Sequence, residues 1–541
     1  MSKAVRNYQA SLFGREERSD CTVVFTLSED QADRPSKRQK PESDEQEIEA
    51  ADALAAPLPG HTLLLCPGSS YFAAQADRWS SQASGSSGSS GKPELRVPLG
   101  CAGDRPHAEA AIRFIYTNKL GLGNPVELLH VRRLAAFLGV EGCVEACDAA
   151  VLAFAKAAGA APLEAVGHLY ACRQLLPQWD DDPAGLSLLD EVMDECRAQL
   201  AGYTGADTAV QLPDGASVTL SKLLVWAFPD APFVLNDPVA RTYMLALPSA
   251  SLKLLLSSHE FATDNEASVL LLLAEWLDAK PGTTEDDRQQ LCHLVRLCHL
   301  SSPYLHGILP LLPWFPVEPL DIRCIQQCAV MRQEERDRYF MAMSNGGRPA
   351  RIANWYVTPA RPKPRSDVCR THEWAIKQEH LEEALAQAEA KPNGLFIDTE
   401  LGGSAGLVAR GLKWGLAVRV SYFAYTFGVQ LTCSLPSALK LNNPDEVYAH
   451  ACPGPCRLTV WRWGPDGDRS AAHQRDFGAP GDLVQTDGNH GLGSIMAVRL
   501  DPSAAGAGAQ DEEDAPLPSA PALWAPYLHA GKLSGSVEWL A

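Results

Sequence analysis

The sequence lacks any long uninterrupted apolar stretch. No window approaches the roughly 18 consecutive apolar residues that a membrane-spanning helix needs. The first twenty residues, MSKAVRNYQASLFGREERSD, also lack the apolar core of a secretory signal peptide. We therefore expect an intracellular protein with no membrane partner.

The sequence also has fewer positively charged residues than negatively charged ones. The chain has 47 Lys and Arg against 66 Asp and Glu, which gives a formal net charge of −19. Surfaces that bind nucleic-acid phosphates or anionic lipid carry an excess of positive charge, so we expect no nucleic-acid partner. One short basic cluster, PSKRQKP at residues 35–41, has the composition that an import receptor reads. This cluster leaves nucleus and cytoplasm both open as locations.

The common catalytic motifs are missing. The sequence has no GxSxG elbow, no GxxxxGK[ST] phosphate loop, no HExxH, and no GxGxxG after a strand. The glycines Gly402, Gly403 and Gly406 lack a nearby lysine that would hold a phosphate, and DGNHG at 487–491 is typical of a turn. We expect no enzyme activity, no catalytic residue and no cofactor.

The 15 cysteines do not form the framework of a disulfide-rich protein. Several of them, such as Cys143 and Cys147, fall on apolar helical faces, which is typical of reduced, buried thiols. The Cys-His pairs at 292–293 and 298–299 contain the ligand types that suit zinc. On one helix, however, residues six apart point about 120° away from each other. We therefore predict core packing and no metal site.

What the sequence does contain indicates several folded domains. A chain of 541 residues suggests three or four units at about 150 residues each, and a hydrophobic fraction of 46% is enough for several cores. Residues 5–150 combine short strands with amphipathic helices, and two stretches interrupt this pattern. Residues 29–57 are charged with few large apolar residues, and residues 80–92 are rich in Gly and Ser. We expect both to be disordered insertions in an α+β domain.

The rest of the chain divides into three segments that differ in the spacing of their apolar residues. Residues 151–343 follow a helical period, with EASVLLLLAEWLDA and RQQLCHLVRLCHL as the clearest helices, so we predict an all-α domain there. Residues 344–392 are expected to be a linker with one solvated helix, EHLEEALAQAEAK. Residues 393–541 alternate with period two, as in Leu416, Val418 and Val420, which predicts an antiparallel β-sandwich.

Several of these segments resemble a known family. The order of Ser19-Asp20, His61 with its leucines, Ser69 with Tyr71 and Phe72, and FIYTNKL at 114–120 resembles the BTB/POZ signature. The segments FATDNEASVLLLLAEWLDA and LVRLCHLSSPYLHGIL resemble the BACK domain that often follows BTB in cullin-3 adaptors. The overall order is similar to that of plant and algal BTB-BACK proteins of the light-response group. The strand content of the C-terminal domain is similar to that of MATH (TRAF-like) sandwiches.

The resemblance implies a homodimer that binds other proteins. It places Asp20 and His61 at the dimer interface, although Asp20 also fits the start of a strand and His61 also fits a local hydrogen bond. The positions that match a cullin-3 contact are Tyr71, Phe72, Gln75, Tyr116 and Thr117. Cullin-binding BTB domains commonly carry a hydrophobic-x-Glu element after this helix, and the stretch AQADRWSSQASG has no Glu.

These observations predict a non-enzymatic dimeric adaptor. In the first interpretation it recruits an unknown target, bound by its C-terminal domain, to a cullin-3 RING ubiquitin ligase. In the alternative it is a BTB scaffold that assembles transcriptional or signalling complexes without a cullin.

Overall fold

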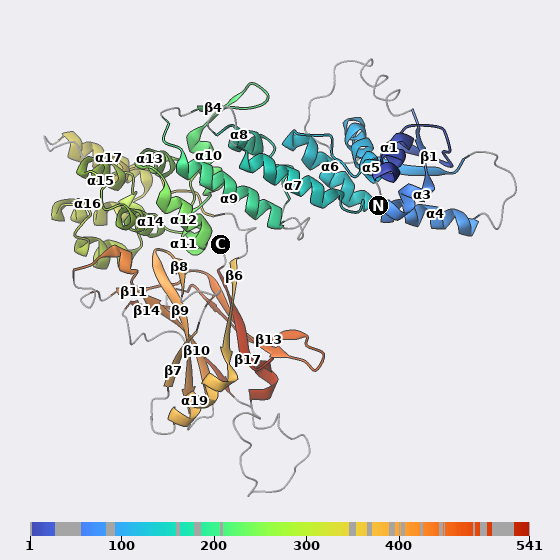
Figure 1. The fold of residues 1–541 in the computed structure, drawn as a ribbon. Coiled ribbons are helices and arrows are strands. Elements are labelled where there is room, and N and C mark those ends of the chain that lie inside the picture. The colour runs from blue at the N-terminus through green and yellow to red at the C-terminus, as the bar shows by residue number, and fades with distance from the viewer. Residues whose placement is uncertain are drawn as a thin grey trace, which may run out of the picture. The chain divides into compact units, whose positions relative to one another are not determined.

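The structure of the chain is a computed structural model (Figure 1). It describes residues 3–27, 56–82, 92–157, 163–177, 186–205, 209–345, 353–364, 370–388, 395–399, 401, 406–421, 426–442, 447, 449–479, 482–486, 495–499 and 524–539. Most of both predicted insertions, and the motifs at 35–41 and 487–491, lie outside the described residues. The chain forms two units, the first of Met1–Gln199 with Ala209–Val218 and the second of Leu200–Thr208 with Thr219–Ala541.

A three-stranded sheet lies at the N-terminal end of the first unit. Its central strand, β1 (Cys21–Leu27), pairs antiparallel with β2 (Leu58–Gly60) and parallel with β3 (Glu94–Leu99). A parallel pair needs a long crossover, and α3 (Thr62–Gly68) and α4 (Ser70–Gln82) lie in it. Alternate residues of β1 are buried, as the period of a half-buried strand requires.

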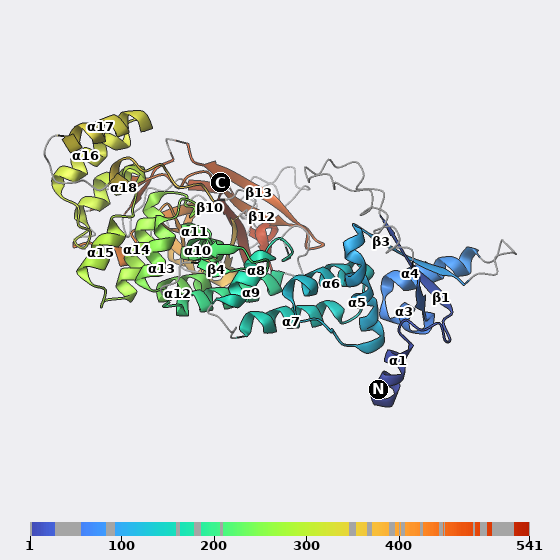
Figure 2. The ribbon, with the colours of Figure 1, turned by 90° about the horizontal axis from the view of Figure 1, so that it is seen from above.

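Helices complete the first unit. Figure 2 shows α5, α6 and α7 as neighbours, and consecutive members of this set are in contact. One face of α5 is buried at Ala108, Ala111, Ile112 and Tyr116, as the helical period requires, and Ile115 is partly buried. The elements are α1 (Lys3–Leu12), η2 (Ala102–Asp104), α5 (Arg105–Thr117), α6 (Pro125–Leu138), α7 (Cys143–Lys156), α8 (Glu164–Ala171), α9 (Leu186–Gly202), β4 (Ala209–Gln211) and β5 (Ser217–Thr219).

The second unit begins with a helical part, in agreement with the predicted α-helical period. Its central helix, α14, is buried along most of its length and carries almost no polar face. The elements are α10 (Leu220–Ala227), α11 (Ala231–Asn236), α12 (Pro238–Ala246), α13 (Ser249–Ser257), α14 (Glu266–Ala279), α15 (Glu285–Cys292), η4 (Leu297–His299), η5 (Tyr304–Ile308), η6 (Leu309–Leu311), α16 (Pro319–Ala329), α17 (Gln333–Asn345) and α18 (Ala353–Tyr356).

One of the two predicted helices in this part is shorter than expected. The sequence predicts a helix over 288–300, whereas α15 ends at Cys292 and the 3₁₀ turn η4 follows at Leu297. The amide N–H of Arg296 donates to Glu266 Oε1 at 3.0 Å instead of to a carbonyl four residues earlier. A buried acceptor on another helix therefore breaks the helical pattern, because apolar periodicity does not report on such a partner.

The strand-rich part of the second unit has two five-stranded antiparallel sheets that share one hydrophobic core. This confirms the prediction of antiparallel strands, and Leu416, Val418 and Val420 of β9 point into the core as their alternation predicts. The first sheet holds β7 (Leu395–Thr399), β8 (Leu407–Ala409), β9 (Leu412–Ser421), β10 (Thr426–Ser434) and β15 (Ile495–Arg499). The second holds β6 (Arg370–Lys377), β12 (Cys456–Trp463), β13 (Arg469–Phe477), β16 (Leu528–His529) and β17 (Lys532–Trp539). The remaining elements of this part are η7 (Ser437–Leu439), the short pair β11 (Ala449–Ala451) and β14 (Val484–Thr486), and η10 (Ala525–Tyr527).

The segment 344–392 is more than a linker. Its residues 370–377 form β6, which pairs with β17 over eight residues from Arg370 to Lys377. Its helix, α19 (Gln378–Ala388), is not solvated on all sides, because Leu381 and Ala384 belong to the sandwich core. The expectation of a solvated linker helix is wrong because its charged residues cover only the outer face.

This packing predicts a large stability difference between two alanine substitutions in α19. Leu381→Ala removes a side chain that is 1% exposed and should lower the free energy of unfolding by about 2–5 kcal/mol. Glu383→Ala alters an exposed position of the same helix and should change the free energy little. Urea unfolding of the two variants measures the difference, and equal effects would contradict the packing of α19 into the core.

Candidate functional site

His61 is part of the interior of the first unit. Its ring is 5% exposed, and its Nδ1 and its backbone N–H both lie near the hydroxyl of Tyr116, at 3.2 and 3.1 Å. Its Nε2 lies 3.2 Å from the carbonyl oxygen of Glu17. Burial raises the pKa of Tyr116, so its hydroxyl stays protonated. The structure therefore supports the local hydrogen-bond interpretation of His61.

Asp20 remains at the surface and caps a helix. Its carboxylate accepts hydrogen bonds from the backbone N–H of Thr62, at 2.8 Å, and from the hydroxyl of Thr62. Partial burial alone would raise the pKa of Asp20, but the hydrogen bonds from Thr62 outweigh it and lower the pKa. An exposed, ionised carboxylate at this place is available to a partner, so Asp20 remains a candidate for the dimer contact.

The side chains of Tyr71 and Gln75 join α4 to the edge of the sheet by hydrogen bonds. Gln75 donates to the carbonyl oxygen of Arg96 at 2.7 Å and accepts from the Arg96 N–H at 2.9 Å, and the Tyr71 hydroxyl donates to the same carbonyl at 3.2 Å. Arg96 belongs to β3, an edge strand whose backbone groups would otherwise stay open to another chain. Both side chains are partly exposed and lie where a partner of α4 would reach them.

Phe72 and Tyr116 were expected to face cullin-3, but both side chains are buried. Their exposed fractions are 0% and 3%, and both belong to the core of the first unit. Their side chains therefore stabilise the fold and are not presented at the surface. Thr117, at the end of α5, is partly exposed and its hydroxyl donates to the carbonyl oxygen of Arg113 at 2.9 Å.

The start of α14 gathers three distant segments of the second unit. We call residues 263–268 the α14 junction. Asn265 is the N-cap, and its side-chain oxygen accepts from the N–H groups of Ala267 and Ser301 at 3.0 and 3.2 Å. The carbonyl oxygen of Pro362 accepts from the N–H of Thr263 at 3.0 Å. The acidic residues of this turn also suit the positive end of the helix dipole.

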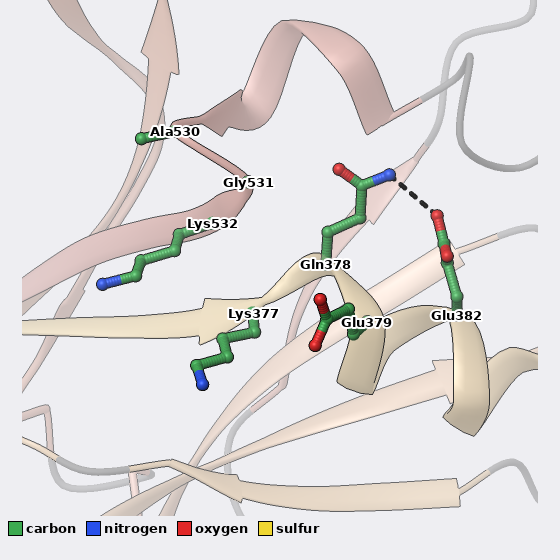
Figure 3. A pocket seen from close by; sticks show the side chains of 7 residues that line it. All are labelled: Lys377, Gln378, Glu379, Glu382, Ala530, Gly531 and Lys532. Atoms are coloured by element: carbon green, nitrogen blue, oxygen red, sulfur yellow. Dashed lines mark hydrogen bonds between the residues drawn. The ribbon is translucent and has the colours of Figure 1, made fainter.

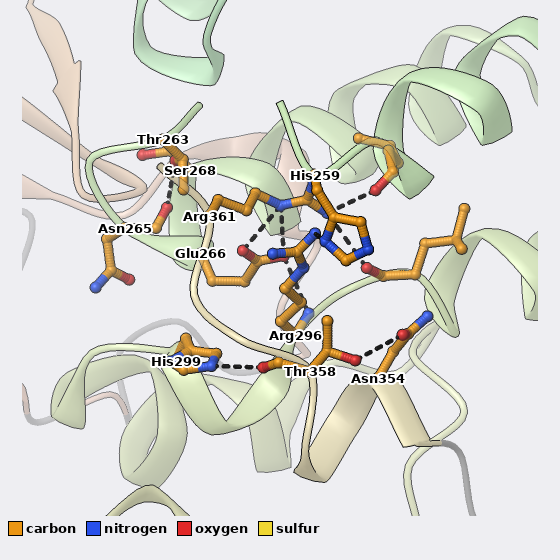
Figure 4. A network of polar contacts seen from close by, with 12 residues as sticks. His259, Thr263, Asn265, Glu266, Ser268, Arg296, His299, Asn354, Thr358 and Arg361 are labelled. Carbon is orange, nitrogen blue, oxygen red and sulfur yellow. Dashed lines mark hydrogen bonds and ion pairs between the residues drawn. The ribbon is translucent and has the colours of Figure 1, made fainter. Parts of the chain in front are cut away.

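A buried ion pair holds the segment after the helical part against this junction (Figure 4). Arg361 Nε lies 3.1 Å from Glu266 Oε2, and the two side chains are 0% and 1% exposed. The remaining guanidinium N–H groups of Arg361 donate to the carbonyl oxygens of Leu256 and Ser258 at 2.7 and 3.1 Å. A buried ion pair is tolerated only when its other donors are also satisfied, and these carbonyls fulfil that condition.

Arg296 is the second arginine beside Glu266 (Figure 4). Its guanidinium donates to the carbonyl oxygen of Pro359 at 2.7 Å, and His299 Nε2 lies 2.8 Å from the carbonyl oxygen of Thr358. Burial, and then the like charge of Arg361, lower the pKa of Arg296 to about 10, so it stays charged near neutral pH. Residues 358–361 are thus fixed along the helical part.

The strand-rich part touches the α14 junction directly through the turn between β8 and β9. The Arg410 N–H donates to Asp264 Oδ2 at 2.5 Å, and the Gly411 N–H donates to the Ser268 hydroxyl at 2.9 Å. The buried hydroxyl of Tyr304 donates to the Gly411 carbonyl oxygen. The Arg410 N–H and both backbone polar groups of Gly411 therefore find partners on the helical part.

Further contacts join the helical and strand-rich parts outside the α14 junction. The side chain of Asn236 makes two bonds of 2.7 Å to the backbone of Val408, one to its N–H and one to its carbonyl oxygen. Trp314 Nε1 donates to the carbonyl oxygen of Leu439 at 3.0 Å, and Lys440 forms an ion pair with Asp278. The helical and strand-rich parts are consequently joined by several independent contacts.

Neither Arg361 nor Gly411 stands out in the sequence as a residue that joins the two parts of the second unit. Arg361 stands in PARPKP, where the prolines indicate an extended segment, and Gly411 stands in ARGLK. A glycine between two strands indicates a tight turn, and Gly411 has the left-handed conformation that such a turn favours. The sequence does not show which residues this turn contacts.

A pocket lies on the strand-rich part, where α19 begins (Figure 3). Its lining consists of Lys377, Gln378, Glu379, Glu382, Ala530, Gly531 and Lys532. Figure 3 shows the lysine side chains on one side and Gln378 with Glu382 on the other, where Gln378 donates to Glu382 at 2.7 Å. The charged groups do not converge on one point, so this pocket provides no acid, base and nucleophile in mutual reach.

The predicted core role of the cysteines agrees with the structure. All described cysteines are free, and most are buried. Cys298 Sγ accepts from Arg336 at 3.1 Å, and burial raises the pKa of the Cys292 thiol to about 12, which disfavours the thiolate that zinc requires. A different group within the described residues, Asp104 with His107 and His130, brings three possible metal-ligand atoms within 4.8 Å of one another.

Residues 239–309 match the family model described as BACK: BTB And C-terminal Kelch. This match supports a protein of the BTB-BACK type. It runs from α12 to the end of η5 and includes the α14 junction. Comparison with curated proteins found no match to the chain. Among the described residues, no helix is both long and apolar enough to span a bilayer.

The contact between Gly411 and the BACK domain predicts a specific effect of one added methyl group. Gly411 has φ +76°, and a Cβ there would lie 2.6 Å from the backbone of Ala267. Gly467 has φ +81°, but the nearest atom, in His529, is 3.9 Å away. Both alanine variants should bear the cost of a left-handed residue, about 1–2 kcal/mol.

Gly411→Ala should therefore cost about 1–3 kcal/mol more than Gly467→Ala, because only the first variant overpacks its site. Chemical unfolding measures both losses, and limited proteolysis tests whether Gly411→Ala frees the strand-rich domain from the BACK domain. Equal losses would contradict the docking of the β8–β9 turn.

Proposed function

We propose that this chain is a non-enzymatic adaptor that joins protein partners through its first unit and its strand-rich domain. The BACK match at 239–309 carries the proposal, because BACK domains occur in BTB-type adaptors. In this proposal residues 5–150 of the first unit form the BTB/POZ domain, which dimerises with Asp20 at the contact. The strand-rich part, which is of MATH type in this proposal, captures a target.

The junction contacts support the division of labour in this proposal. A target-binding part that is already held rigidly on its neighbouring helices loses less entropy when it binds its partner. The contacts of Asp264, Ser268 and Tyr304 with the β8–β9 turn fix the strand-rich domain on the BACK domain. Dimerisation would then present two target sites and add avidity.

The finer proposal is a substrate-recruiting subunit of a cullin-3 RING ubiquitin ligase. Tyr71, Gln75 and Thr117 are the candidate contact residues that are partly exposed. The second candidate, a scaffold that works without a cullin, is favoured by two observations. The stretch 74–85 has no Glu, and Phe72 and Tyr116 are buried in the core.

A matched pair of substitutions tests the cullin contact. Thr117→Arg introduces a long charged side chain on the proposed surface, whereas Ser344→Arg does so at the exposed end of α17, where Ser344 makes the same type of bond to a carbonyl four residues earlier, at 2.9 Å. If the full-length chain binds the N-terminal domain of cullin-3, Thr117→Arg should weaken binding by at least about tenfold. Ser344→Arg should leave it unchanged.

Affinity purification with purified cullin-3 measures this binding, and sedimentation of each variant checks that the oligomeric state is preserved. Absence of cullin-3 binding by the wild-type chain would favour the scaffold. Equal binding by both variants would show that the cullin surface lies elsewhere.

A further inference from the structure

Two histidines and one aspartate meet in the first unit. Asp104 ends the turn η2, His107 lies in the first turn of α5, and His130 lies in the middle of α6. One ligand atom from each residue lies within 4.8 Å of the other two. The His107 and His130 rings are stacked with their centres 4.7 Å apart.

One ring nitrogen of each histidine, Nδ1, lacks a hydrogen-bond partner among the described residues. The Nδ1 atoms of His107 and His130 are both buried, and neither has a partner among the described residues. A buried polar atom without a partner costs about 1–3 kcal/mol, so such atoms are rare in stable proteins unless they serve another purpose. Two of them on stacked rings, beside a carboxylate that is itself buried, are typical of a site that a ligand completes.

We propose that Asp104, His107 and His130 bind a divalent transition-metal ion, with zinc as the best fit. Two imidazoles and one carboxylate suit zinc, whereas magnesium and calcium prefer a shell of oxygen ligands. Three protein ligands leave the fourth position of a tetrahedral zinc ion for water or for a side chain of a partner. This site is independent of the adaptor function proposed above.

The three ligand atoms must move closer together to bind one zinc ion. Zinc ligands at about 2.0–2.2 Å from the ion lie about 3.5 Å from one another, so each side chain must shift by roughly an ångström. Arg133 Nη2 lies 2.9 Å from Asp104 Oδ1, but the Arg133 side chain is 59% exposed and is free to turn toward water. Asp104 Oδ2 also accepts from the Cys101 N–H at 3.3 Å, which orients the carboxylate without using all of its lone pairs.

A bound ion would tie α5 to α6 and would stabilise the first unit by mass action.

Metal titration of the full-length, tag-free chain tests the proposal. Cobalt(II), followed by its visible absorption, and zinc(II), followed by calorimetry, should each bind at one site per chain in chelator-free buffer. His107→Gln and His130→Gln should each weaken binding by at least about tenfold. His450→Gln, at an exposed position of β11, should bind as the wild type does.

Zinc should also raise the thermal unfolding midpoint of the wild type and of His450→Gln, but not of the other two variants. Should those two variants fail to fold, histidine modification of the wild-type chain replaces them, and zinc should protect His107 and His130 from reaction. The proposal is overturned if wild-type binding does not saturate at one ion, if His130→Gln keeps wild-type affinity, or if zinc protects other histidines instead.

Discussion

The second unit depends on one buried carboxylate. Glu266 lies in the first turn of α14, is 1% exposed, and receives an ion pair from Arg361 and a backbone hydrogen bond from Arg296. A charge removed from water is costly unless a partner and further hydrogen bonds compensate it. The chain meets this requirement by bringing residues 296 and 361, which are 65 positions apart, to the same carboxylate. The path of the chain from the BACK domain to the strand-rich domain is set there.

The neighbours of Glu266 extend this constraint to the strand-rich domain. Asp264 and Ser268 flank Glu266 in the α14 junction and receive the N–H groups of Arg410 and Gly411. One turn at the start of one helix therefore orders both the segment that enters the strand-rich domain and the turn by which that domain docks. The helical and strand-rich parts of the second unit are therefore held together at the α14 junction.

Several features could be predicted from the sequence because they depend on local pattern. Asn265 as an N-cap and the end of α14 before Pro281 follow from capping preferences, and the alternation in β9 follows from its buried face. A comparable alternation in β6, with Trp374 and Ile376 buried between exposed neighbours, was present but was obscured by the prolines and charges around it.

Other features could not be predicted because they depend on contacts between distant residues. Arg361 has no local pattern that distinguishes it from the arginines near it. The meeting of Asp104 and His107 with His130 requires the packing of α5 on α6, which no spacing within one helix reveals. The burial of Phe72 and Tyr116 follows from the same tertiary packing, so a family motif alone placed them at a surface.

The central claim is that the α14 junction couples the BACK domain to the strand-rich domain. Arg361→Met keeps the length of the side chain and removes its charge, which should lower the free energy of unfolding by about 3–5 kcal/mol. Hydrogen exchange of the full-length variant tests the coupling most directly, with Arg457→Met, in an exposed ion pair, as the control. If the junction couples the two parts, the Arg296, Arg410 and Gly411 amides should exchange faster in Arg361→Met than in the wild type. Faster exchange confined to the residues around position 361 would contradict it.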